Sequence, residues 1–199
     1  MSILVLTSDT LIGTPAAGNL EYNGQFFGTD SNTSRAQMQR ITQGTAVAST
    51  SGTSIDFTSI PAWVKRITVM FEGVSTNGTS PFIIQVGDSG GVETTAYTGS
   101  AIRAVNADVT NAYSFSTGFI VTSVTAAAST STGIATIVLQ STSSALWVFS
   151  YTGALTNAAV GFFSAGNKTL SATLDRVRIT TVNGTDTFDA GSINILYEG

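Results

Sequence analysis

The sequence contains neither cysteine nor histidine. Without cysteine the chain can form no disulfide and can supply no thiolate as a nucleophile or metal ligand. Without histidine it lacks the side chain that serves most often as a general base and as a zinc ligand. Disulfide and thiolate chemistry are therefore excluded, and so is catalysis that depends on histidine.

Charged residues are also scarce. They make up 10% of the 199 residues, against about a quarter in a typical globular protein. Serine, threonine and glycine take their place. This composition fits a β-rich surface built from small hydroxyl residues. It fits equally a surface adapted for assembly, because few charges keep identical copies apart.

The eight lysines and arginines are scattered along the chain, and the net charge is −4. No basic stripe is present, so a nucleic-acid partner is not expected. No apolar run approaches the roughly 18 residues that span a bilayer. The short apolar run in Met1–Leu6 has no basic residue before it, so we expect neither a signal peptide nor membrane insertion.

The stretch Ile60–Gly91 organises the rest of the chain. Apolar and more polar residues alternate in Val64–Phe71 and again in Phe82–Val86, and a period of two is typical of half-buried strands. Between the two segments lies Asn77-Gly78, one of the strongest short-range signals for a β-hairpin. The sequence therefore predicts that these two strands pair with each other.

From Ser54 onward about nine strand-like segments follow at short intervals, with almost no helical periodicity. This pattern predicts an all-β fold: an antiparallel β-sandwich over residues 49–199, with a jelly-roll-like topology as the best guess. The loops of this domain are expected near Gly73–Ser80, Gly99–Asn111 and Ala126–Gly133.

Residues 1–48 lack the regular succession of strand-like segments seen later in the chain, and they are expected to form an extended N-terminal attachment arm and linker. Asn23-Gly24 predicts a hairpin too small to be stable alone. Residues 35–41 are compatible with a short helix or a short strand, and residues 45–53 with a linker. The apolar residues of the hairpin need a partner surface, and they are the candidate attachment residues: Leu20, Tyr22, Phe26 and Phe27.

No catalytic, cofactor-binding or metal-binding residue is predicted. The pentapeptide from Gly87 to Gly91 is identical to the nucleophile motif of chymotrypsin-like proteases, but that chemistry needs a histidine. A turn explains the motif without catalysis. The twelve acidic residues lie mostly in predicted turns, so a glycosidase pair is not favoured. Asp186 and Asp189 are the only weak candidates for calcium ligands.

The segment Trp147-Val-Phe149-Ser-Tyr151 is the most distinctive aromatic strand. Its three rings share one face, and two interpretations are open. Either they point into the core of the sandwich, or they form a subunit interface or a ledge for stacking on a glycan, since large rigid aromatic side chains dominate such contacts.

Three parts of the chain resemble virion proteins of tailed bacteriophages. The first is Thr10-Leu-Ile-Gly-Thr-Pro15 with Gly18, Leu20-Glu-Tyr22, Gly24 and Phe27. The second is Ile60-Pro-Ala-Trp63, continuing through Ile67-Thr-Val69 and Gly73-Val-Ser-Thr-Asn-Gly78 to Gln85-Val-Gly-Asp-Ser-Gly90. The third is Asn183-Gly-Thr-Asp-Thr-Phe188-Asp-Ala-Gly191-Ser-Ile-Asn194. Together they cover roughly half of the chain.

The resemblance implies a non-enzymatic structural protein, assembled into the virion in the host cytoplasm as a homo-oligomer, most simply a trimer. Its partners would be other virion proteins and a host surface glycan or receptor. The favoured position is the tail, as a short fibre or receptor-binding tip. The alternative position is the phage head, as a decoration or cement protein. From a different class of function, the rival is a stand-alone carbohydrate-binding module, in which Trp147 or Tyr151 would stack on the sugar.

Overall fold

The structure is a computed structural model that describes residues 10–11, 13–23, 25–105, 108–114, 116–122 and 126–199. It divides into two compact units, Met1–Arg40 and Ile41–Gly199. Every regular element in these described ranges is a β-strand. No helix long and apolar enough to cross a membrane occurs among them. The expected all-β class is confirmed.

The first unit contains one three-stranded antiparallel sheet, built from β1 (Leu20–Tyr22), β2 (Phe26–Thr29) and β3 (Arg35–Gln37). The predicted β1–β2 hairpin is present, although Gly24 of its turn lies outside the described residues. The alternative of a short helix over residues 35–41 is wrong. The Asp30 side chain accepts the backbone N–H groups of Asn32 and Ser34, at 2.8 and 2.9 Å, and the chain reverses here so that β3 pairs with β2.

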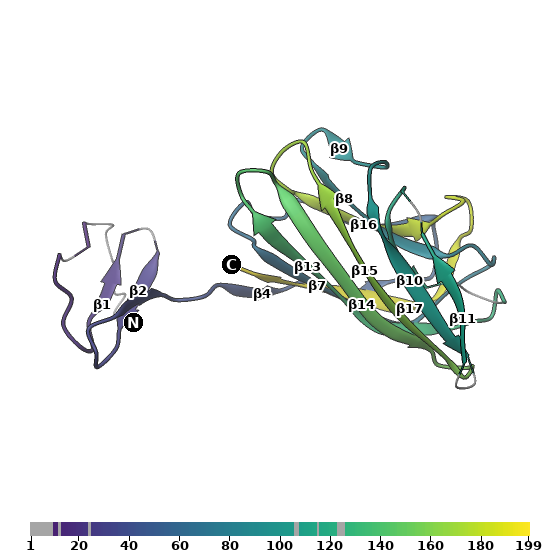
Figure 1. Ribbon diagram of the computed structural model, residues 1–199, viewed down its shortest axis with the longest axis horizontal. Helices are drawn as coiled ribbons and strands as arrows, with labels where there is room; N and C mark the ends of the chain where they lie inside the picture. Colours follow the sequence, from purple (N-terminus) through teal and green to yellow (C-terminus); the bar gives the residue numbers. More distant parts are fainter. Residues whose placement is uncertain (1–9, 12, 24, 106–107, 115, 123–125) are drawn as a thin grey trace, which may run out of the picture. The chain divides into compact units, whose positions relative to one another are not determined.

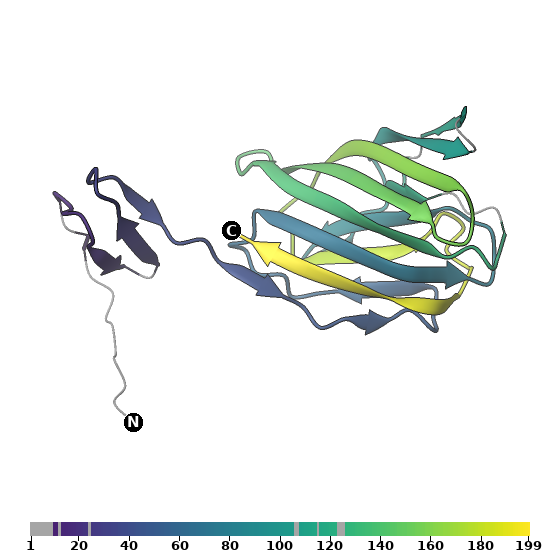
Figure 2. The ribbon, with the colours of Figure 1, turned by 90° about the horizontal axis from the view of Figure 1, so that it is seen from below.

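The second unit is a sandwich of two antiparallel sheets (Figures 1 and 2). The nine-stranded large sheet contains β4 (Ile41–Gln43), β5 (Val47–Ala48), β7 (Arg66–Thr76), β10 (Thr98–Val105), β11 (Asp108–Tyr113), β13 (Ser131–Ser141), β14 (Leu146–Leu155), β15 (Val160–Thr169) and β17 (Phe188–Glu198). The five-stranded small sheet contains β6 (Ser54–Phe57), β8 (Phe82–Asp88), β9 (Gly91–Val92), β12 (Phe119–Thr122) and β16 (Arg176–Thr181).

The chain crosses repeatedly between the two sheets. The order of the large sheet is β11-β10-β15-β14-β13-β7-β17-β4, with β5 also on β17, and that of the small sheet is β12-β8-β16-β6, with β9 on β8. Early strands thus pair with late ones, β7 with β17 and β8 with β16, in a jelly-roll-like manner. The consecutive strands β13, β14 and β15 add a meander inside the large sheet. Figure 2 shows β17 (yellow) beside β7 (blue).

The prediction that Asn77-Gly78 closes a hairpin is wrong, because β7 and β8 belong to different sheets. The turn is instead hydrogen-bonded to the loop before β17. Asn77 exchanges hydrogen bonds with the backbone of Thr187, both 2.9 Å long. A Cβ at Gly78 would lie 2.0 Å from Asp186 Oδ2, so any other residue here would have to displace that carboxylate. Both strands exist as expected, but the dipeptide connects the sheets.

The boundary of the sandwich lies closer to the N-terminus than residue 48. The strands β4 and β5 both pair with β17 in the large sheet. Between them, the Gly44 N–H donates to the Ile195 carbonyl at 2.7 Å. Residues 41–48, expected to belong to the arm and linker, are therefore part of the second unit, and the N-terminal segment ends at Arg40.

Strands cover most of one expected loop and half of another. Residues 98–113 form the β10–β11 hairpin apart from residues 106–107, which lie outside the described residues. Residues 73–76 complete β7. The two sandwich sheets contain nine and five strands, more than the roughly nine that the sequence pattern indicated, because several strands are short or irregular.

Candidate interaction surfaces

The N-terminal sheet has one apolar face and one polar face. The register pairs Leu20 with Gly28 and Tyr22 with Phe26, and side chains at alternate positions share a face. The Met38 N–H donates to the Phe26 carbonyl at 2.8 Å, which extends the same face to Met38. Leu20, Phe26 and Met38 are 60%, 42% and 50% exposed. We call Leu20, Tyr22, Phe26 and Met38 the N-terminal apolar face.

The opposite face of this sheet carries an ion pair. Arg35 donates to both carboxylate oxygens of Glu21, from Nε at 2.7 Å and from Nη2 at 3.1 Å. By the same alternation Phe27 lies on this side. The structure thus brings together three of the four predicted attachment residues and separates Phe27 from them. Met38 was missed because residues 35–41 were compatible with a helix.

The N-terminal apolar face is also hollowed. A pocket of about 220 Å³ is lined by Tyr22, Phe26 and Met38, together with neighbouring polar side chains. The rings of Tyr22 and Phe26 lie with their centroids 5.0 Å apart. A three-stranded sheet with such a face has little core of its own, so burying this face against another surface stabilises both the contact and the sheet.

A second apolar surface covers the outward side of the large sheet. Five apolar side chains are exposed on β10, β13, β14 and β15: Ile102, Ile134, Val138, Val148 and Phe163. The register places Ile102 opposite Phe163 and Val138 opposite Val148. We call these five residues the outer apolar patch. The strands β13, β14 and β15 contain a single charged residue, Lys168, and it is buried. The strands β13, β14 and β15 therefore expose no charged side chain here, and Arg66 of the neighbouring β7 lies opposite Val138 at the border of the patch.

The aromatic strand points inward. Trp147, Phe149 and Tyr151 are all buried in the core. Phe149 stacks on Phe119 of the small sheet with centroids 4.5 Å apart and rings 2° from parallel. The structure therefore supports the interpretation that these rings face the core. They form neither an exposed subunit interface nor a ledge for glycan stacking.

The protease-like pentapeptide forms the turn between β8 and β9. Asp88 Oδ1 accepts the Gly90 N–H at 2.8 Å, and Asp88 Oδ2 accepts the Ser171 hydroxyl at 2.5 Å. Asp186 and Asp189 accept hydrogen bonds from different residues, Ser80 and Asn183 for the first and Ser75 for the second. No group of three metal-ligating residues occurs in the part of the chain that the structure describes.

A charged cluster that sequence patterns did not indicate lies between the sheets. Lys168 Nζ is 2.5 Å from Glu93 Oε2 and 5.4 Å from the centre of the Tyr97 ring. The Tyr97 hydroxyl accepts the Val86 N–H at 2.7 Å and donates to the Glu93 carbonyl at 2.9 Å. Burial raises the pKa of Tyr97 above its ordinary value and keeps the phenol neutral. The cluster holds the segment after β9 against β8 and β15.

Acid is expected to weaken the fold through two carboxylates near this cluster. The hydrogen bond from Ser171 is the main cause of a lowered pKa at Asp88. Burial raises the pKa of Glu93, but hydrogen bonds from Lys168 and Ser171 outweigh it and the net pKa is lowered. Because both folded values lie below the unfolded ones, their stabilisation is complete above about pH 5 and is lost as the pH falls below about 4.

Urea denaturation between pH 7 and pH 2.5 measures this loss. The urea concentration at half-unfolding should decrease once the pH is below 4. This decrease should be less steep in Asp88→Asn. A midpoint that stays constant down to pH 3 would contradict the role of these carboxylates.

Comparison with protein-family models and with curated proteins finds no match to this chain.

Proposed function

We propose that this chain is a non-enzymatic structural protein of a tailed-bacteriophage virion, carried on the tail as a short fibre or receptor-binding tip. The observation that carries the proposal is the N-terminal apolar face. An exposed apolar face on so small a sheet calls for a covering surface, and a virion neighbour supplies one. The resemblance of Thr10–Phe27 to a segment of phage tail proteins supports the same role.

Assembly of several copies fits the outer apolar patch. Identical copies bring identical charges together, and like charges at an interface oppose association. The strands β13, β14 and β15 expose no charged side chain on this side. We propose a homotrimer, and light scattering on the purified chain measures the number of copies. The loops of the sandwich would then contact a host glycan or receptor.

A head decoration protein is the second candidate, since a compact sandwich with an apolar attachment sheet also suits a capsid surface. Immunogold labelling of intact particles with antibody against residues 49–199 separates the two positions. Gold at the tail supports the proposed role, and gold over the head supports decoration. Particles left unlabelled by an antibody that recognises the folded protein would contradict both.

Attachment should depend on the N-terminal apolar face. The double substitution Leu20→Ser with Phe26→Ser removes most of its exposed apolar surface and is expected to reduce incorporation into particles at least about tenfold, since burial of two large side chains is worth a few kcal/mol. Western blotting of particles assembled in a strain lacking the native protein measures incorporation.

Val182→Ser is the matched control for this experiment, because Val182 is an exposed apolar residue of the sandwich. It should incorporate normally. A deletion should end at Arg40, so that β4 and β5 stay in the sheet. Normal incorporation of both the double variant and the deletion would rule out attachment through this face.

A further inference from the structure

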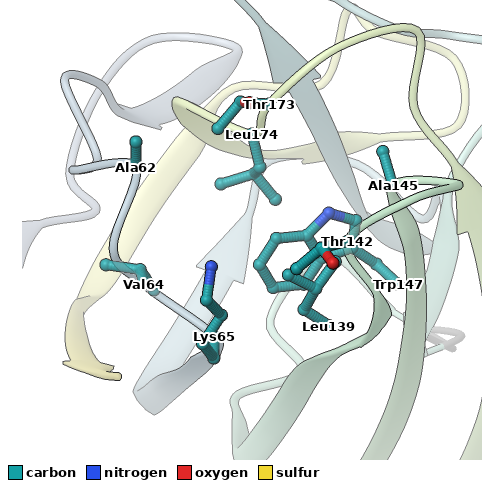
Figure 3. Close-up of a pocket in the computed structure, with 9 residues that line it drawn as sticks. All are labelled: Ala62, Val64, Lys65, Leu139, Thr142, Ala145, Trp147, Thr173 and Leu174. Atoms are coloured by element: carbon teal, nitrogen blue, oxygen red, sulfur yellow. The ribbon is translucent and has the colours of Figure 1, made fainter.

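A pocket of about 190 Å³ lies in the second unit (Figure 3). Three separated parts of the chain form it: the turn before β7, the β13–β14 connection and the segment before β16. Val64, Leu139 and Leu174 supply apolar walls, and Lys65, Thr142 and Trp147 supply polar groups. The pocket is smaller than the roughly 300 Å³ at which sites for drug-sized ligands begin, so its occupant is small.

The indole N–H of Trp147 has no hydrogen-bond partner within the described chain. The residue is 3% exposed. Figure 3 shows its ring among the side chains lining the pocket, with the nitrogen on the edge toward Leu174 and Ala145. Buried polar side-chain atoms nearly always have a partner. The acceptor of this N–H, a water or a bound molecule, therefore lies outside the described chain.

Lys65 adds a positive charge to the same pocket. Figure 3 shows its ammonium group between Val64 and the indole ring. Among the residues that the structure describes, no carboxylate pairs with it, whereas the next residue, Arg66, has its Nε 3.3 Å from Glu198 Oε2. Lys65 is an exposed residue, so water solvates its ammonium when the pocket is empty. An ammonium beside apolar walls nevertheless favours an anion, and a carboxylate is the anion that both an ammonium and neutral donors bind well.

We infer that this pocket binds a small carboxylate attached to a ring-sized group. The Lys65 ammonium pairs with the carboxylate, and the Thr142 hydroxyl and the Trp147 N–H are the neutral donors available to it. The ring lies against Val64, Leu139 and Leu174. The volume is consistent with such a ligand, because an apolar cavity of about 150 Å³ holds benzene. An aromatic acid and a hexuronate residue of a polysaccharide share this chemistry.

The chain has two tryptophans, so its ¹H–¹⁵N spectrum contains two indole signals, and Trp63→Phe identifies the one from Trp147. Titration of the full chain with benzoate and, separately, with glucuronate is expected to shift the Trp147 signal saturably at millimolar concentrations. The probe that saturates at the lower concentration identifies the source, aromatic acid or acidic sugar. Benzyl alcohol and glucose, which lack the carboxylate, should bind at least about tenfold more weakly.

Two substitutions of equal charge separate the pocket from general electrostatics. Lys65→Gln removes the ammonium from the pocket and should weaken binding about tenfold or more. Arg66→Gln removes the same charge from the neighbouring residue, which does not line the pocket, and should leave binding unchanged. The inference is overturned if neither acid shifts the Trp147 signal, if the neutral probes bind equally well, or if both substitutions weaken binding alike.

Discussion

Phe149→Ala should lower the free energy of unfolding of the sandwich by about 3–5 kcal/mol, the usual cost of truncating a buried phenylalanine. Phe149 lies on the large sheet and Phe119 on the small one, and their stacked rings connect the two layers. Tyr97 extends the contact with its ring edge-on to Phe119, at a centroid distance of 4.9 Å. Alanine removes the stack and leaves a cavity between the sheets. Urea denaturation measures the change.

Val148→Ala is the control for this substitution. Val148 is the adjacent residue, and it lies in the outer apolar patch rather than in the core. Its truncation should change stability by no more than about 0.5 kcal/mol. Equal effects of the two substitutions would contradict the prediction that the stack of Phe149 on Phe119 stabilises the sandwich.

Glu93→Gln should destabilise the fold by about 3 kcal/mol. Lys168 is 4% exposed, and the substitution leaves its ammonium buried without a counter-charge, which typically costs about 3–5 kcal/mol. The lower end applies because the Glu93 side chain is itself 23% exposed. Glutamine keeps an acceptor for the Ser171 N–H, which donates to Glu93 at 2.8 Å. The effect therefore reports on the charge.

Lys168→Met completes a double-mutant cycle. Once Glu93 is Gln, removing the buried ammonium should restore stability, because a buried pair replaced by neutral groups is often nearly neutral in free energy. The double variant is thus expected to be more stable than Glu93→Gln alone. Additive losses in the cycle would show that the two residues act independently.

Periodicity predicted the layers of this protein better than the connections between them. The alternation through Trp147, Phe149 and Tyr151 is enough to place these rings on one face, and in a sandwich the aromatic face is usually the inner one. Asn77-Gly78 correctly predicted a turn. It could not indicate pairing, because the turn is held by Asp186 and Thr187, more than a hundred residues later in the chain.

The candidate sites show the same division. The hairpin pattern located Leu20, Tyr22 and Phe26, but Met38 joins them only because Asp30 reverses the chain before β3. Lys168 sits in a strand, where a charge is expected to face water, and its partner Glu93 is far away in sequence. The pocket at Trp147 is formed by three segments that are far apart in the sequence, and a local sequence pattern cannot predict that they lie side by side.

The interior position of β17 has a consequence for folding during synthesis. This last strand of the chain lies between β7 on one side and β4 and β5 on the other, and β16 lies between β6 and β8 in the small sheet. Each sheet thus receives this interior strand only after its other strands have been synthesised. Until then one edge of β7 and one edge of β8 have no partner strand. Unpaired strand edges of this kind make incompletely folded β-proteins prone to aggregate. Completion of both sheets therefore waits for the synthesis of β16 and β17.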